Sequence, residues 1–150
     1  MSGRLLKNQF VVVPALALGI AGAVGCSAES APKPKPGSLL PGTAQLTIDG
    51  KPAHATEAVQ CSTVESTTTI ETGDDDGGVT LVVSNAGPLI VQFVRIRKLS
   101  GFTGDYNLGL EGDARIAMTG STYDISGAAL GYGPTSIEPT THPFEIRVSC

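Results

Sequence analysis

The alternation of apolar and polar side chains is the feature of this chain that most limits its fold. Residues 144–150 read FEIRVSC, so that Phe, Ile, Val and Cys alternate with Glu, Arg and Ser. A period of two places one set of side chains on one face of a β-strand, and after Thr43 no convincing apolar run has helical spacing. The 150 residues include 19 Gly and 10 Pro, a turn-rich composition unlike that of a helical bundle. We therefore expect one all-β domain over residues 43–150, an antiparallel β-sandwich or a similar sheet-rich unit.

Turn signals divide this domain into hairpins. Asp49-Gly50 is a type I′ turn pair after the short strand at 46–48, and a loop at 73–78 separates two further strand patterns. The clearest hairpin spans 114–127, where Gly120-Ser121 fits a type II′ turn. Pairing Thr119 with Thr122 places Met118 opposite Tyr123 and Ile116 opposite Ile125, so the apolar pairs share one face.

The stretch 89–99 predicts a long strand with an irregularity inside it. Leu89, Val91 and Phe93 share one phase, after which the apolar phase moves to Val94 and Ile96. One extra residue in a strand produces such a shift, so we expect a β-bulge near Phe93-Val94.

The first 26 residues have the pattern of an export signal. Residues 1–9 carry Arg4 and Lys7 without an acid, and residues 10–24 contain no charged or polar side chain. This apolar run is shorter than the roughly 20 residues that span a bilayer as a helix. Ala23-Val24-Gly25-Cys26 then resembles the bacterial lipobox, which departs here from its commonest form in having Ala23 where Leu is usual. We expect residues 1–25 to be cleaved and Cys26 to carry a thioether-linked diacylglycerol; the alternative is an ordinary secretory signal.

A lipidated Cys26 predicts where the domain is held. Two acyl chains give stable membrane attachment, whereas one gives only marginal binding. Residues 26–42 are rich in Pro, Ser and Lys, a composition that favours an extended tether, either a plain spacer or a carrier of O-linked sugars. Loss of Arg4 and Lys7 takes the net charge from −4 to −6. We therefore predict an exported, lipid-anchored protein on the outer face of the cell membrane.

The two remaining cysteines suggest a disulfide. Cys150 falls on the apolar phase of the last strand, and Cys61 shares a face with Val59. Both thiols point inward and lie outside the reducing cytosol if the chain is exported, so we expect a Cys61–Cys150 bridge. The alternative is a pair of buried free thiols.

The residues give no sign of catalysis or of metal binding. His54 and His142 stand beside prolines in turn-like contexts, far apart in the sequence, and no ligand spacing for a metal surrounds them. The chain lacks the nucleophile elbow, the phosphate-binding loop and the dinucleotide fingerprint. The acidic run 74–76 is typical of a solvated hairpin loop, and no basic stripe points to nucleic acid. We expect no catalytic residue, no metal and no cofactor.

Two features are candidates for partner binding. Arg95 and Arg97 form a small basic spot that suits an anionic glycan or lipid headgroup, although such residues also protect sheet edges. Phe102 and Tyr106 lie in the Gly-rich stretch 100–113, which has the composition of a recognition loop or of a loose connection.

Several of these motifs together resemble one family. The lipobox cysteine, the Pro/Ser-rich tether, the LTIDGK segment at 46–51, the VQC segment at 59–61 and the final FEIRVSC are similar to the mycobacterial lipoprotein antigens of the LpqH type. The segment 91–102 is closest to the LppE branch. The resemblance covers nearly the whole chain. It implies a surface-exposed envelope lipoprotein whose acylated N-terminus is sensed by host Toll-like receptor 2, with no catalytic residues to transfer.

Three functions follow as hypotheses. The first is a non-enzymatic envelope lipoprotein that presents a β domain for contacts with proteins or glycans. The second is a lipid or glycolipid carrier, which requires a pocket of several hundred Å³ lined by apolar side chains. The third is an enzyme whose polar residues come together only in the fold.

Overall fold

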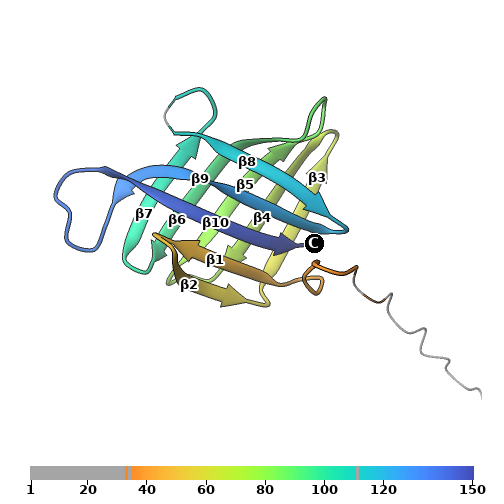
Figure 1. Cartoon of the computed structure of the whole chain (residues 1–150), viewed down its shortest axis with the longest axis horizontal. Coiled ribbons are helices and arrows are strands. Elements are labelled where there is room, and N and C mark those ends of the chain that lie inside the picture. Colours follow the sequence, from red (N-terminus) through yellow and green to blue (C-terminus); the bar gives the residue numbers. More distant parts are fainter. Residues whose placement is uncertain (1–32, 34, 111) are drawn as a thin grey trace, which may run out of the picture. The chain divides into compact units, whose positions relative to one another are not determined.

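Ten antiparallel strands make up the fold of the residues that the structure describes, which are 33, 35–110 and 112–150 (Figure 1). The structure is a computed structural model. The predicted signal peptide and Cys26 lie outside the described residues. The strands are β1 (Ala44–Ile48), β2 (Lys51–Thr56), β3 (Val59–Val64), β4 (Thr67–Gly73), β5 (Gly78–Ser84), β6 (Ile90–Leu99), β7 (Phe102–Asn107), β8 (Ala114–Thr119), β9 (Thr122–Tyr132) and β10 (Thr140–Ser149).

All ten strands belong to a single sheet that curls over itself. The strand order is β2-β1-β10-β9-β7-β6-β5-β4-β3, and β8 pairs with β9 outside this path. Strand β9 changes its partner along its length, because residues 122–127 pair with β8 and residues 130–132 pair with β7. In Figure 1, β1, β8, β9 and β10 run across strands β4 to β7. The curled sheet therefore forms the two layers of a β-sandwich, and the predicted all-β fold is confirmed.

The hydrophobic core lies between these two layers. The first layer contributes side chains from β1, β9 and β10, and the second contributes side chains from β4 to β7. The alternation in 144–150 works as predicted, since Phe144, Ile146 and Val148 are at most 2% exposed. The cluster consists of Ala44, Leu46, Ile48, Ile70, Val79, Leu81, Val91, Val94, Ile96, Leu99, Phe102, Tyr106, Ile125, Ala129, Phe144, Ile146 and Val148.

Two glycines allow the sheet to turn from one layer into the other. Gly104 of β7 pairs directly with Gly131 of β9, in the short ladder that joins the layers. A Cβ atom on Gly131 would lie 2.2 Å from the carbonyl oxygen of Thr103, and one on Gly104 would lie 2.6 Å from that of Leu130. Neither site has room for a side chain, so the close approach of β7 and β9 depends on glycine.

The predicted turns and hairpin register are confirmed. Asp49 and Gly50 both have positive φ, 52° and 71°, as a type I′ turn requires. Strand β8 pairs with β9 in the expected register, from Thr119 opposite Thr122 to Ile116 opposite Ile125. Gly120, with φ of 62°, occupies the first central position of that turn.

The predicted bulge in β6 is also present. Val82 pairs with Phe93 and Val83 pairs with Val91, so Gln92 is the extra residue. The bulge therefore lies just before the expected Phe93-Val94 site. It allows both Val91 and Val94 to reach the core, where each is at most 2% exposed.

The predicted loop at 100–113 is largely wrong, because residues 102–107 form strand β7. The inward phase of this strand consists of Phe102, Gly104 and Tyr106, all of them buried. Because the middle one of these three inward residues is a glycine, the sequence does not show a clear alternation of apolar and polar side chains. Packing against β9 requires that glycine.

The end of the predicted tether joins the β domain. The N–H of Leu39 donates to Oγ1 of Thr122 at 2.8 Å, and Nη2 of Arg147 donates to the carbonyl oxygen of Gly37 at 2.6 Å. The N–H of Gly42 donates to the carbonyl oxygen of Ser149. Residues 37–42 are therefore held by β9 and β10, although we expected them to belong to an independent spacer.

The seam between the layers gives a first prediction. We expect Gly131→Ala to lower the free energy of unfolding by about 1–3 kcal/mol, because its methyl group has no space beside the backbone of Thr103. Gly87→Ala is the matched control, since a Cβ there meets no atom within 4 Å. Urea unfolding of both variants under non-reducing conditions measures the difference. Equal stability of the two variants would contradict the importance of this close approach.

Candidate functional site

A disulfide joins Cys61 of β3 to Cys150, which directly follows β10. The predicted pairing is confirmed, with a Cα–Cα distance of 6.0 Å. The bridge connects the last strand of the sheet order to a strand of the opposite layer. It therefore fastens the two layers together on the side away from the β7–β9 seam.

The environment of the two cysteines differs from our expectation. Cys61 has the same phase as Val59 in β3, and Cys150 has the phase of Val148, as predicted. Both half-cystines are nevertheless exposed. For Cys61 the physical reason is that β3 lies at an edge of the sheet, where β4 is its only partner among the described strands.

The closed loop gives a second prediction. The bridge spans a sequence separation of 89 residues, and the chain-entropy model assigns about 4–5 kcal/mol to a loop of that length. We expect the double variant Cys61→Ser, Cys150→Ser to lose stability of that order in urea unfolding. Ser62→Ala, on the same exposed strand, is the control. A double variant as stable as the control would show that the bridge does not hold the layers together.

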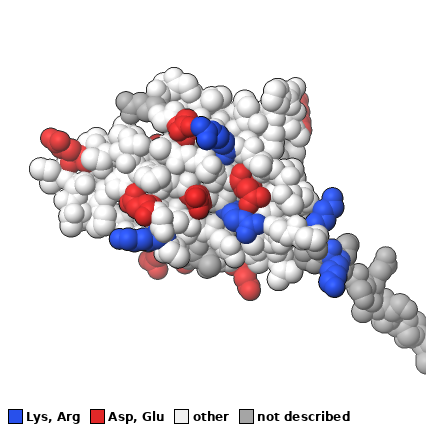
Figure 2. Space-filling model, in the orientation of Figure 1, with Lys and Arg blue, Asp and Glu red and all other residues white. Residues whose placement is uncertain are grey.

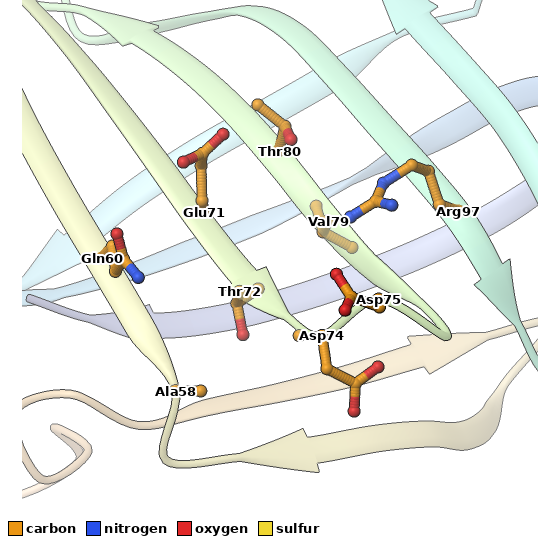
Figure 3. Close-up of a pocket in the computed structure, with 10 residues that line it drawn as sticks. Ala58, Gln60, Glu71, Thr72, Asp74, Asp75, Val79, Thr80 and Arg97 are labelled. Atoms are coloured by element: carbon orange, nitrogen blue, oxygen red, sulfur yellow. The ribbon is translucent and has the colours of Figure 1, made fainter.

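A polar depression of about 250 Å³ lies where β3, β4 and β5 meet the loop at 73–78 (Figure 3). The hydroxyl of Thr72, a residue only 5% exposed, has no hydrogen-bond partner there. The depression is lined mainly by polar side chains, which suits hydrogen bonding to water or to a small polar solute rather than enclosure of a large ligand. Its lining residues are Ala58, Gln60, Glu71, Thr72, Gly73, Asp74, Asp75, Val79, Thr80 and Arg97.

The acidic loop beside this depression is the predicted hairpin connection. It links β4 to β5, and Oδ1 of Asp74 accepts hydrogen bonds from the N–H groups of Asp76 and Gly77. Asp74 therefore stabilises the turn itself. Among the described residues, no group of three or more His, Cys, Asp or Glu side chains is arranged to hold a metal ion.

The two arginines proposed for partner binding have separate surroundings. Nε of Arg95 lies 2.9 Å from Oδ1 of Asp105, and the Arg95 guanidinium lies 5.1 Å from the centre of the Phe93 ring. Arg97 extends from β6 toward Val79 and Asp75 (Figure 3). Arg95 is thus neutralised by an acid on β7, while Arg97 borders the polar depression.

The two aromatic residues proposed for partner binding lie in the core. Phe102 is 1% exposed and Tyr106 is 3% exposed. Neither ring is available to a partner at the surface. The expectation failed because the glycines of this stretch serve strand packing rather than loop mobility.

A hydrogen-bonded chain that the sequence did not reveal connects Asp49, His142 and Thr140. Nδ1 of His142 lies 2.8 Å from Oδ2 of Asp49, and Nε2 lies 2.9 Å from Oγ1 of Thr140. The imidazole also packs on the Phe102 ring, with centroids 4.5 Å apart. These hydrogen bonds link the β1–β2 turn to β10. His142 lies in strand β10 and not in the predicted turn. Only the fold brings Asp49 and His142 together.

The outer face of β8, β9 and β10 carries charges of both signs. Figure 2 shows acidic and basic side chains intermixed on this side of the molecule. Nε of Arg147 lies 2.6 Å from Oδ1 of Asp124, and Nη2 of Arg115 lies 3.5 Å from Oδ2 of Asp113. Such pairing leaves no broad field of one sign on this face. In the described part of the chain, no helix reaches the length and hydropathy needed to cross a membrane.

The fold and its bridge define a class of protein, a small two-layer β domain closed by one long-range disulfide. The sequence model of the Mycobacterium 19 kDa lipoprotein antigen matches residues 37–150. The match begins where the structure attaches the chain to β10, at Gly37. The chain therefore belongs to the mycobacterial 19 kDa lipoprotein antigen family, as the sequence resemblance indicated.

Known relatives are similar along almost their full length. A lipoprotein of Mycobacterium avium subsp. hominissuis is 33% identical over 147 residues, covering 97% of each chain. Lipoprotein LppE of Mycobacterium tuberculosis is 33% identical over 147 residues, covering 95% of this chain and 99% of its own. Lipoprotein LpqH of Mycobacterium bovis BCG is 30% identical over 156 residues, covering 96% and 98%. These relatives are named as lipoproteins, and their family is an antigen family rather than an enzyme family.

Proposed function

We propose that this protein is a non-enzymatic envelope lipoprotein, anchored to the outer face of the cell membrane by a diacylated Cys26, that presents its β domain to other molecules. The observation that carries the proposal is the family match over residues 37–150, downstream of a lipobox-like sequence that ends at Cys26. The exposed disulfide supports an oxidising location outside the cytosol.

The attachment of residues 37–42 to the domain defines the length of the tether. Because Gly37 is bonded to Arg147, the proposed tether consists of residues 26–36. An extended segment of that length reaches about 35 Å at about 3.1 Å per residue. The domain therefore stays close to the membrane, and its net negative charge gives it no attraction to anionic headgroups.

The anchor gives a third prediction. We expect the intact mass of the parent protein to equal residues 26–150 plus a diacylglycerol on Cys26, and Cys26→Ala to abolish both the lipid and the cleavage before residue 26. Intact-mass spectrometry of membrane fractions measures both events. Ala23→Leu is the matched variant, because it restores the commonest lipobox residue and should speed processing. A parent protein that lacks the lipid would refute the anchor.

We further propose that the lipid, and not the β domain, is the element that host Toll-like receptor 2 senses. Two acyl chains offer far more apolar contact than the surface of an acidic β domain. The charges on the β8–β10 face are intermixed with acids. The domain then serves other contacts.

Receptor sensing gives a fourth prediction. We expect a synthetic diacylated peptide of residues 26–33 to activate a Toll-like receptor 2 reporter cell, and the same peptide without acyl chains to be silent. The folded domain, exported with a cleavable secretory signal in place of residues 1–26, should also be silent. A strong response to that lipid-free protein, with lipopeptide contamination excluded by mass spectrometry, would assign recognition to the domain.

The carrier hypothesis has weaker support. Buried side chains of both layers occupy the space between them. A depression of about 540 Å³ beside Leu39 and Leu40 has the volume of a ligand site, but polar groups of Ser38, Thr56 and Glu57 contribute to its lining. Native mass spectrometry of gently purified protein separates the two proposals, since a co-purifying lipid other than the anchor would favour the carrier.

A further inference from the structure

Among the described strands, three have only one partner and form edges of the sheet, namely β2, β3 and β8. Strand β2 starts with Lys51 and Pro52, and β8 contains Arg115; charged residues and proline discourage another strand from pairing with an edge. Strand β3 reads VQCSTV and contains no charge, no proline and no glycine. The edges at β2 and β8 therefore carry protecting residues, and the edge at β3 is open to strand addition.

The turn after β3 determines which backbone groups point away from the sheet. Val64 pairs with Thr67 across the two-residue turn Glu65-Ser66. Residues that flank such a turn form a hydrogen-bonded pair, and the pattern then alternates along the strand. Gln60 and Ser62 are thus bonded to β4 like Val64, whereas the N–H and C=O groups of Cys61 and Thr63 face outward.

The side chains of β3 are as accessible as its backbone. All of its residues are exposed except Val59, which is half-buried, and Val64 is 70% exposed. The disulfide to Cys150 holds this edge in place. The result is a rigid, uncharged strand with unpaired hydrogen-bonding groups.

We propose that β3 pairs antiparallel with β3 of a second copy of this chain, with the two-fold axis at Ser62. In this register Cys61 of one copy forms a hydrogen-bonded pair with Thr63 of the other. Gln60 lies opposite Val64 and covers it. The two sheets then continue through the contact, which is an isologous interface.

Charge disfavours one neighbouring register. A contact centred on Cys61 instead would place Glu57 opposite Glu65 at both ends, and like charges directly opposite destabilise strand pairs. The Ser62-centred contact avoids that clash, and β3 brings no charge of its own. A second copy therefore provides a complementary strand without any other protein. The short contact predicts a weak dimer that forms as the protein concentration rises.

Site-specific crosslinking gives a fifth prediction. In a non-hydrogen-bonded pair the Cβ atoms are about 4.5–5.5 Å apart, close enough for a disulfide. We expect the full chain with Ser62→Cys, oxidised in membranes with diamide, to give at least tenfold more covalent dimer than Gln60→Cys. Gln60→Cys is the matched control, because it lies on the same face of the same strand but not opposite itself. Peptide mapping must show an intact Cys61–Cys150 bridge and a link between the two introduced thiols.

A second variant tests the contact without added thiols. Ser62→Lys places two ammonium groups opposite each other on the two-fold axis and should abolish the concentration-dependent dimer in sedimentation, while urea unfolding stays unchanged. Equal crosslinking of both cysteine variants, a stronger dimer from Gln60→Cys, crosslinking to a different protein, or a parent chain that remains monomeric at high concentration would each overturn the proposal.

Discussion

The close approach of β7 and β9 is the constraint on which the rest of the structure depends. A single sheet encloses a core only if it turns from one layer into the other, and here the turn occurs where β9 exchanges β8 for β7. Gly104 and Gly131 face each other at that point. The core cluster draws side chains from both layers, so its burial follows from this seam. The lack of a side chain at Gly104 and Gly131 thus determines where the large core side chains pack.

The disulfide joins the two layers at the side opposite the β7–β9 pairing. Cys61 lies on the last strand of the order, and Cys150 follows a strand of the opposite layer. Without the bridge, β3 would be held by β4 alone, since its pairing involves no second strand. The bridge therefore fixes an edge that ordinary sheet pairing leaves half free. That explains how a strand with almost no buried side chain keeps a defined position.

The sequence predicted the parts of this fold that local chemistry determines. Turn residues such as Asp49-Gly50 and Gly120-Ser121 specify their own φ angles, and alternation assigned the inward faces of β9 and β10. Strand β7 was missed because its inward phase passes through Gly104, whose role depends on a strand distant in sequence. The same reason applies to Phe102 and Tyr106, which composition placed in a loop and the fold places in the core. The His142–Asp49 contact likewise requires the β1–β10 pairing before it exists.

The distribution of chemistry along the chain argues for a division of tasks. The described domain pairs several of its charges with neighbours, as in Arg95–Asp105 and Arg147–Asp124. Its apolar side chains are used mainly to fill the space between two layers. Arg147 uses its guanidinium twice, once for Asp124 and once for the carbonyl oxygen of Gly37. The same side chain therefore links the outer face of β9 and β10 to the segment that precedes β1. Among the described strands, β3 is the edge that carries no charge and no proline.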